Sequence, residues 1–199
     1  VVVRGTDRGL ALADLARTVH FRSGDVAGLE PSLEATVHYA NPEAWTFTSG
    51  AHLAMVEVDV ETGHVRVLRY VTVDDCGRVV NPAMVAGQIA GGVAQGIGGA
   101  LWEHCAYDDA GQPLGTTLMA YAVPTAAMLP PIEVHHLETP APTIAGGFKG
   151  AGEAGTTGAP AAILNAVNDA LAPFDTMITD QPVTPERVLR ALGRLGRRT

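Results

Sequence analysis

One carboxylate, Glu153, lies on unusually bare backbone. The stretch KGAGEAGTTGAP at residues 149–160 surrounds it with four glycines and ends in a proline. A carboxylate on such a loop, shielded from bulk water, can have a raised pKa and act as a general base. The same residue could instead be a charge that stabilises the N-terminus of a following helix and pairs with Lys149. The residues alone leave both interpretations open.

A second candidate region is the segment PAMVAGQIAGGVAQGIGGALWEHC at residues 82–105. Apolar residues recur every four positions, which predicts one long helix with Pro82 in its first turn. Each glycine costs a helix interior about 0.5–1 kcal/mol relative to alanine. Either close packing of another backbone or a ligand against the helix could compensate, with Gln88 and Gln95 offering amide groups on one face. The glycines in or next to this helix are Gly87, Gly91, Gly92, Gly96, Gly98 and Gly99.

The other polar residues predict no metal site. Asp74 and Asp75 end a predicted strand, and alternation points them to opposite faces; His135 and His136 are arranged in the same way. None of the histidines shows metal-ligand spacing, and no His-Glu-x-x-His motif is present. His52, which follows a glycine turn, is the least ordinary of them.

Helices and strands must position these candidates. Helices are predicted at 9–21, 82–105 and 160–171 and from Thr184 onward, with Pro160 near the first helical position and Thr184 as an N-cap. Strands are predicted at 1–5, at 33–39, in a hairpin over 52–75 and at 132–138. Residues 1–199 are predicted to form one α+β unit without a linker, in which helices pack on an antiparallel sheet.

Composition narrows the class of protein. The 199 residues are 47% hydrophobic and 17% charged, which is typical of a globular chain. The net charge of −8 argues against nucleic acid as a partner, and no apolar run of about 18 residues predicts a membrane span. Two distant cysteines, Cys76 and Cys105, fit a reduced, cytoplasmic chain. The first residue is not methionine, which indicates a processed product or a piece of a longer chain.

Three motifs in a fixed order resemble one enzyme family. VDDCGRVVNPAMVAGQIAGGVAQGIGGALWE is followed by FKGAGEAGTTGAPAAILNAVNDAL and then by DQPVTPERVLRAL. This combination resembles the C-terminal part of the large subunit of the xanthine dehydrogenase family. That family comprises the molybdenum hydroxylases, including aldehyde oxidoreductases and aerobic carbon monoxide dehydrogenases. The resemblance implies a fold that is part of the second molybdopterin-binding domain.

The resemblance also implies a cofactor and roles for particular residues. The cofactor would be molybdopterin cytosine dinucleotide, whose molybdenum is held by the pterin and not by protein side chains. Glu153 matches the catalytic glutamate, the general base that takes a proton from a molybdenum-bound hydroxyl, and Gln88 matches a glutamine near the molybdenum. The residues expected along the cofactor are Gly87, Gln88, Gly91, Gly92, Gln95, Lys149, Gly150, Ala151 and Gly152.

Partners follow from the same resemblance. The chain would need the remainder of the large subunit, a small subunit with iron–sulfur clusters and a medium subunit with FAD. The substrate would be an aldehyde, an N-heterocycle or a similar small molecule. Many relatives carry Pro-Pro after the glutamate, whereas this chain carries the smaller Ala154 and Gly155, so the resemblance does not define the pocket shape or the substrate. The alternatives are a structural or assembly fragment that binds no cofactor alone and, more weakly, a stand-alone nucleotide-binding module.

Overall fold

The chain divides into two compact units, residues 1–42 and 43–199. The computed structural model describes residues 1–22, 24, 32–40 and 45–196. In the first unit, α1 (Leu12–Phe21) follows a single bridge between Val2 and Gly9, and no strand forms over 1–5. The strand predicted at 33–39 is also wrong, because its alternating residues have no sheet to pack on and Val37 is 83% exposed. The division into two units thus differs from the single unit that was predicted.

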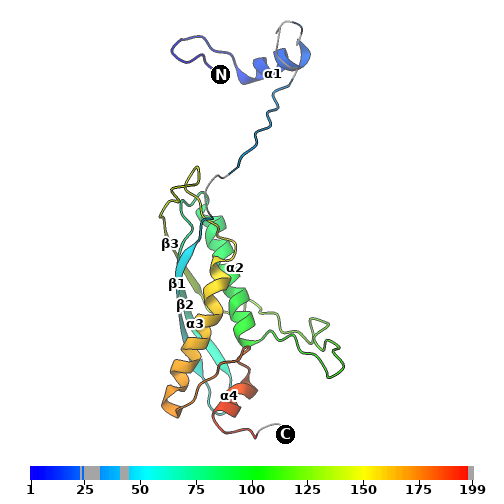
Figure 1. Ribbon diagram of the computed structural model, residues 1–199, viewed down its shortest axis with the longest axis vertical. Coiled ribbons are helices and arrows are strands. Elements are labelled where there is room, and N and C mark those ends of the chain that lie inside the picture. The colour runs from blue at the N-terminus through cyan, green and yellow to red at the C-terminus, as the bar shows by residue number, and fades with distance from the viewer. Residues whose placement is uncertain (23, 25–31, 41–44, 197–199) are drawn as a thin grey trace. The chain divides into compact units, whose positions relative to one another are not determined.

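The second unit contains a three-stranded sheet (Figure 1). Its strands are β1 (Ser49–Val58), β2 (Val65–Asp75) and β3 (Ile132–Leu137), in the order β1-β2-β3. β1 and β2 form the predicted antiparallel hairpin, in which Gly63 has a φ of 76°. β3 runs parallel to β2. The α+β class is confirmed, but the sheet is mixed and not antiparallel throughout as predicted, because a long crossover through a helix carries the chain back before β3 begins.

A bulge in the hairpin decides which side chains of β2 face inward. The register between β1 and β2 shifts at Met55 and Val56. Before the shift Val65 and Val67 are buried, and after it Tyr70, Thr72 and Asp74 are buried. A bulge interrupts the two-residue alternation in this way. It therefore turns a tyrosine, a threonine and an aspartate toward the helices.

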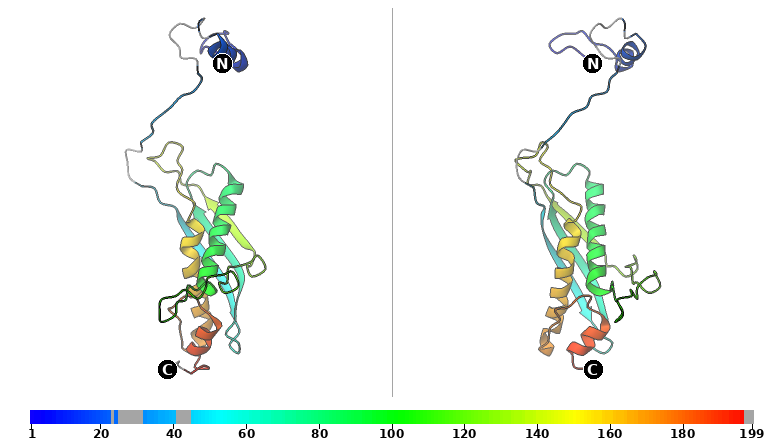
Figure 2. Two further views of the ribbon diagram at one scale, coloured as in Figure 1. Left: turned by 90° about the vertical axis from the view of Figure 1, so that its right-hand side faces the viewer. Right: turned by 45° about the vertical axis from the view of Figure 1, so that its right-hand side comes forward.

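Two helices cover one face of the sheet and form the core with it (Figure 2). α2 (Pro82–Leu101) lies over β3, and α3 (Ala154–Leu171) lies over β1 and against α2. Ile89, Val93 and Ile97 of α2 are fully buried with Ile163 and Val167 of α3. The four-residue apolar period predicted this face of α2 correctly, although the helix ends at Leu101 and not at residue 105.

α3 begins at Ala154, not near Pro160 as predicted. Pro160 therefore lies inside the helix, where a proline costs about 3 kcal/mol because it removes a backbone hydrogen bond. Close packing of the first turn of α3 on α2, described below, offsets this cost. The short helices η2 (Ala172–Phe174) and α4 (Pro185–Ala191) follow, and Thr184 caps α4 as predicted by accepting a hydrogen bond from the Arg187 N–H.

Candidate functional site

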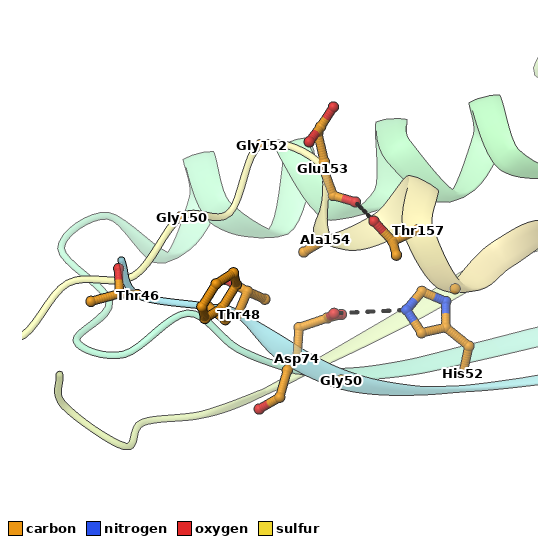
Figure 3. A pocket seen from close by; sticks show the side chains of 13 residues that line it. Thr46, Thr48, Gly50, His52, Asp74, Gly150, Gly152, Glu153, Ala154 and Thr157 are labelled. Carbon is orange, nitrogen blue, oxygen red and sulfur yellow. Dashed lines mark hydrogen bonds and ion pairs between the residues drawn. The ribbon is translucent and has the colours of Figure 1, made fainter. Parts of the chain in front are cut away.

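Glu153 lies where the loop from β3 enters α3. Its backbone carbonyl accepts hydrogen bonds from the Thr157 N–H (3.0 Å) and the Thr157 hydroxyl (2.9 Å). Its side chain is exposed and makes no capping hydrogen bond within the described residues. Figure 3 shows the carboxylate extending away from Asp74 and His52. Glu153 is the N-cap residue of α3, so its charge lies at the positive end of the helix dipole even without a capping hydrogen bond.

Lys149 does not pair with Glu153. Its ammonium nitrogen lies 3.3 Å from Oδ1 of Asp75, at the end of β2. Both side chains are largely buried, with 14% of Lys149 and 9% of Asp75 exposed. Hydrogen bonds from the Thr139 hydroxyl, from backbone N–H groups and from Lys149 hold the pKa of Asp75 well below its ordinary value, although burial opposes them. Asp75 is thus a charged partner of the loop.

The glycine-rich segment 149–153 is called the bare loop below. Asp75 holds its first residue, Lys149, and Gln88 holds the loop near its last residue. Its side-chain amide donates a hydrogen bond to the carbonyl of Gly152, at 3.1 Å. Gly152 immediately precedes Glu153, so the contact joins α2 to the backbone beside the carboxylate. The sequence predicted Gln88 and Glu153 as members of one site, and the structure brings them together.

The glycines of α2 divide into two groups with different surroundings. A Cβ on Gly92 would lie 2.9 Å from the backbone nitrogen of Thr156, and one on Gly96 would lie 2.5 Å from the Cβ of Ala159. A Cβ on Gly155 would collide with the Ile89 carbonyl. This group lets the backbones of α2 and α3 approach closely, which is the packing alternative left open by the sequence.

The second group faces open space. Among the described residues, no atom lies within 4 Å of a Cβ placed on Gly87 or Gly91 of α2, or on Gly150 or Gly152 of the loop. Gly87 and Gly91 are one helical turn apart and exposed, as are Gln88 and Gln95. Residues from α2 and from the loop therefore present a surface of nearly bare backbone around Gln88 and Glu153.

A cavity of about 550 Å³ lies on the sheet side of the loop (Figure 3). The residues preceding β1, the strands β1 and β2, the loop and α3 all contribute to its lining. Asp74 and Glu153 are the acidic groups of this lining, which contains no lysine or arginine. The hydroxyl oxygen of Thr48 is buried there without a hydrogen-bond partner among the described residues. The lining also includes Phe47 and Ala154, so the cavity is partly apolar, and its unpaired hydroxyl and acidic groups favour a group that donates hydrogen bonds.

His52 and Asp74 form a buried pair in the wall of this cavity. Nε2 of His52 lies 3.7 Å from Oδ1 of Asp74, and Nδ1 is hydrogen-bonded to the Tyr70 hydroxyl at 2.8 Å. Thr72 donates a hydrogen bond to the other oxygen of Asp74 at 2.5 Å. Burial, helped by the charge of Asp74, raises the pKa of Tyr70 far above its ordinary value, so the phenol stays protonated at neutral pH. This network holds His52 and Asp74 in fixed orientations.

Sequence reasoning missed the partners in these two networks. It placed Asp74 and Asp75 on opposite faces, and their contacts do differ: Asp74 meets His52, and Asp75 meets Lys149. It did not connect either aspartate to its partner, because both contacts depend on tertiary folding. The only available signal was the glycine turn before His52. Burial raises the pKa of Cys76, which disfavours a nucleophilic thiolate there.

No group of three or more histidine, cysteine or acidic side chains is arranged to hold a metal ion in the described part of the chain. Within the same residues, no helix is long and apolar enough to cross a membrane.

Comparison with known proteins identifies similar chains. The model of the molybdopterin cofactor-binding domain family matches residues 1–130. The nicotine 6-hydroxylase large subunit of Paenarthrobacter nicotinovorans is 45% identical over 96% of this chain and 23% of its own length. The carbon monoxide dehydrogenase large chain of Hydrogenophaga pseudoflava is 38% identical over 96% of this chain and 23% of its own length.

Solved structures of similar enzymes also match most of this chain. Quinoline 2-oxidoreductase from Pseudomonas putida 86 matches with a TM-score of 0.81 and 44% identity, over 91% of this chain and 23% of that one. A Cu,Mo-carbon monoxide dehydrogenase matches with a TM-score of 0.80 and 33% identity over the same shares. The chain thus spans about a quarter of the length of these relatives.

Proposed function

Since this chain belongs to the molybdopterin cofactor-binding domain family, we propose that it is the part of a molybdenum hydroxylase large subunit that supplies the catalytic base, Glu153. The cofactor, when bound, would supply the two-electron oxidation of the substrate. The task of this chain would be to present a proton acceptor beside that cofactor and to leave room for it.

The position of the Glu153 carboxylate carries the proposal. It is exposed, it makes no capping hydrogen bond to α3, and it stands at the end of a loop that Gln88 holds against α2. A general base must reach the proton that it removes, and a side chain already paired within the protein cannot do so without breaking that pair. Among the described residues, Glu153 combines such freedom with a fixed backbone.

The bare backbone around Glu153 fits a bulky cofactor. Side chains on Gly87, Gly91, Gly150 or Gly152 would fill space that is now open. We assign these glycines, together with Gln88, Gln95 and Ala151, to the cofactor surface, where exposed amide and backbone groups can donate and accept hydrogen bonds. Gly92 and Lys149, also predicted there, make contacts inside the chain, so their contact with the cofactor rests on the family resemblance alone.

The finer points of the proposal concern the cofactor form, the partners and the substrate. The cytosine dinucleotide form of the cofactor, and partner subunits that carry iron–sulfur clusters and FAD, are proposed from the family resemblance. One relative, 39% identical, is the gamma subunit of a 6-hydroxypseudooxynicotine dehydrogenase complex. An N-heterocycle is the substrate class that we favour, because the names of two relatives at 45% and 44% identity refer to nicotine and quinoline.

The test is the substitution Glu153→Gln in the complete enzyme that contains this chain. The amide has nearly the same size but cannot take the proton, so we expect kcat to fall by roughly 10²–10⁴-fold, the usual contribution of a general base. Molybdenum content per enzyme should remain unchanged. Glu57→Gln, at an exposed glutamate of β1, is the control and should leave kcat unaltered.

Two outcomes would count against the proposal. If Glu153→Gln retained molybdenum and kept its rate within about tenfold of the parent, Glu153 would not be the base. If the complete parent enzyme purified with neither molybdenum nor cytidine, the alternative of a structural fragment without cofactor would be favoured.

A further inference from the structure

We propose that Asp75 is a positioning residue for Glu153, acting through a largely buried ion pair with Lys149 that fixes the start of the bare loop. This inference rests on the proposed role of Glu153 and adds a second residue, on a different element, that controls where that carboxylate lies. Asp75 itself has no part in the proton transfer.

Asp75 gathers donors from three separate segments. Its Oδ1 atom accepts hydrogen bonds from the Gly77 N–H at 2.9 Å, the Thr139 N–H at 3.1 Å and the Lys149 ammonium at 3.3 Å. These donors come from the turn after β2, the segment after β3 and the start of the bare loop. One carboxylate oxygen therefore joins the end of β2 to both ends of the connection between β3 and Glu153.

Backbone contacts around the ion pair confine the same segment. The Lys149 N–H donates to the Cys76 carbonyl at 2.8 Å, and the Arg78 N–H donates to the Gly147 carbonyl at 3.0 Å. Gly77 has a φ of 69°, and a Cβ on it would collide with the Gly147 carbonyl. The loop thus starts from a tightly packed, hydrogen-bonded base.

The loop beyond Lys149 has little packing of its own. Gly150 and Gly152 have no side chains to pack, and no described atom lies within 4 Å of the place where a Cβ would be. Its next contact from outside is the hydrogen bond from Gln88 to Gly152. A chain so rich in glycine loses much conformational freedom when it is fixed. The anchors at Lys149 and Gly152 must therefore determine where Glu153 lies.

The substitution Asp75→Asn isolates the ion pair. Asparagine keeps an oxygen that can accept from the Gly77 and Thr139 N–H groups, but it removes the charge and leaves a buried ammonium without its counter-ion. We expect the loop to become mobile and kcat to fall about tenfold or more with little change in KM, because a misplacement of about 1 Å can cost on the order of 10²-fold in rate.

Hydrogen exchange supplies a readout independent of activity. In the complete enzyme, Asp75→Asn should speed the exchange of backbone amides at 147–153, including the Lys149 amide, and leave those of α4 unchanged. Glu133→Gln is the matched control, since it breaks another ion pair of β2, that with Arg69 on the exposed surface. The control should alter neither the loop exchange nor kcat.

A double variant tests whether Asp75 acts on Glu153 through Lys149. Lys149→Met keeps most of the side-chain stem and removes the charge. If the pair acts as a unit, Asp75→Asn combined with Lys149→Met should lose no more activity than the worse single variant. Losses that multiply would overturn the proposal, and so would unchanged loop exchange in Asp75→Asn. If Asp75→Asn kept full activity while Glu153→Gln was inactive, only the positioning role of Asp75 would be rejected. If Glu153→Gln were active, the proposed catalytic role of Glu153 would be rejected.

Discussion

Asp75 and Glu153 are both acidic, but their surroundings suit them to opposite tasks. Glu153 is exposed and makes no side-chain cap, whereas Asp75 is almost completely buried and accepts several hydrogen bonds. The hydrogen bonds hold the charge of Asp75 in place, which suits an anchor. The freedom of Glu153 suits a proton acceptor. The sequence singled out Glu153 through its glycines but gave no equivalent signal for Asp75.

The depressed pKa of Asp75 predicts how acid affects stability. A carboxylate with a lowered pKa in the folded state stabilises the protein above its unfolded pKa, about 3.9, and loses that contribution as the pH falls further. The difference in free energy of unfolding between the parent chain and Asp75→Asn should therefore be constant from pH 7 to about 5 and shrink below about pH 4. Urea unfolding at several pH values measures it. A difference that stayed the same down to pH 3 would show that the charge of Asp75 is not stabilised by folding.

At the scale of elements, glycines allow the close approach of α2 and α3. Two neighbouring residues of α2 separate the two uses of glycine, since Gly91 faces open space and Gly92 faces the backbone of α3. A helix with so many glycines is less stable in isolation than one with alanines at the same positions, so α2 depends on its packing against α3. The spacing of the glycines was visible in the sequence, but which of them pack and which are open depends on where α3 begins.

Substitution of these neighbours by alanine should change stability in opposite directions. Gly91→Ala should stabilise the chain by about 0.5–1 kcal/mol, because alanine favours the helix and meets no atom. Gly92→Ala should destabilise it by about 1–3 kcal/mol, because its Cβ would lie 2.9 Å from a backbone nitrogen. Thermal or urea unfolding of the two variants compares them directly. Equal effects would mean that α2 and α3 are not packed as described.

Local patterns predicted several elements correctly. The period of α2, the hairpin turn at Gly63 and the Thr184 cap all depend on neighbours in the chain. The parallel pairing of β3 and the early start of α3 depend on distant segments, so the sequence pattern could not determine them. The bulge in β2, opposite Met55 and Val56, is a similar case, since it decides that Asp74 faces His52.

At the scale of the whole molecule, the surface formed by Gly87, Gly91, Gly150 and Gly152 is not covered by other described residues of this chain. The chain spans about 23% of the length of its relatives, and the exposed backbone of Gly87 and Gly91 lies on its surface. In our proposal the remainder of the large subunit encloses the cofactor against this surface. Filling the surface should therefore affect cofactor content more than folding.

Gly91→Leu tests this in the complete enzyme. Leucine is a strong helix former, so α2 should remain folded, while the side chain occupies the proposed cofactor space. We expect molybdenum content to fall at least severalfold. Gly99→Leu is the control, at another glycine of α2 whose Cβ would meet no atom, and should retain molybdenum. Equal molybdenum content in both variants would place the cofactor elsewhere.

The role of Glu153 is tested most directly by the rate of a single turnover. Mixing substrate with the complete, molybdenum-loaded enzyme in the absence of an external electron acceptor separates the oxidation of the substrate from the later reoxidation of the enzyme. If Glu153 is the general base, Glu153→Gln should slow this step by at least roughly 10²-fold at equal molybdenum content. A single-turnover rate within about tenfold of the parent would contradict the role assigned to Glu153.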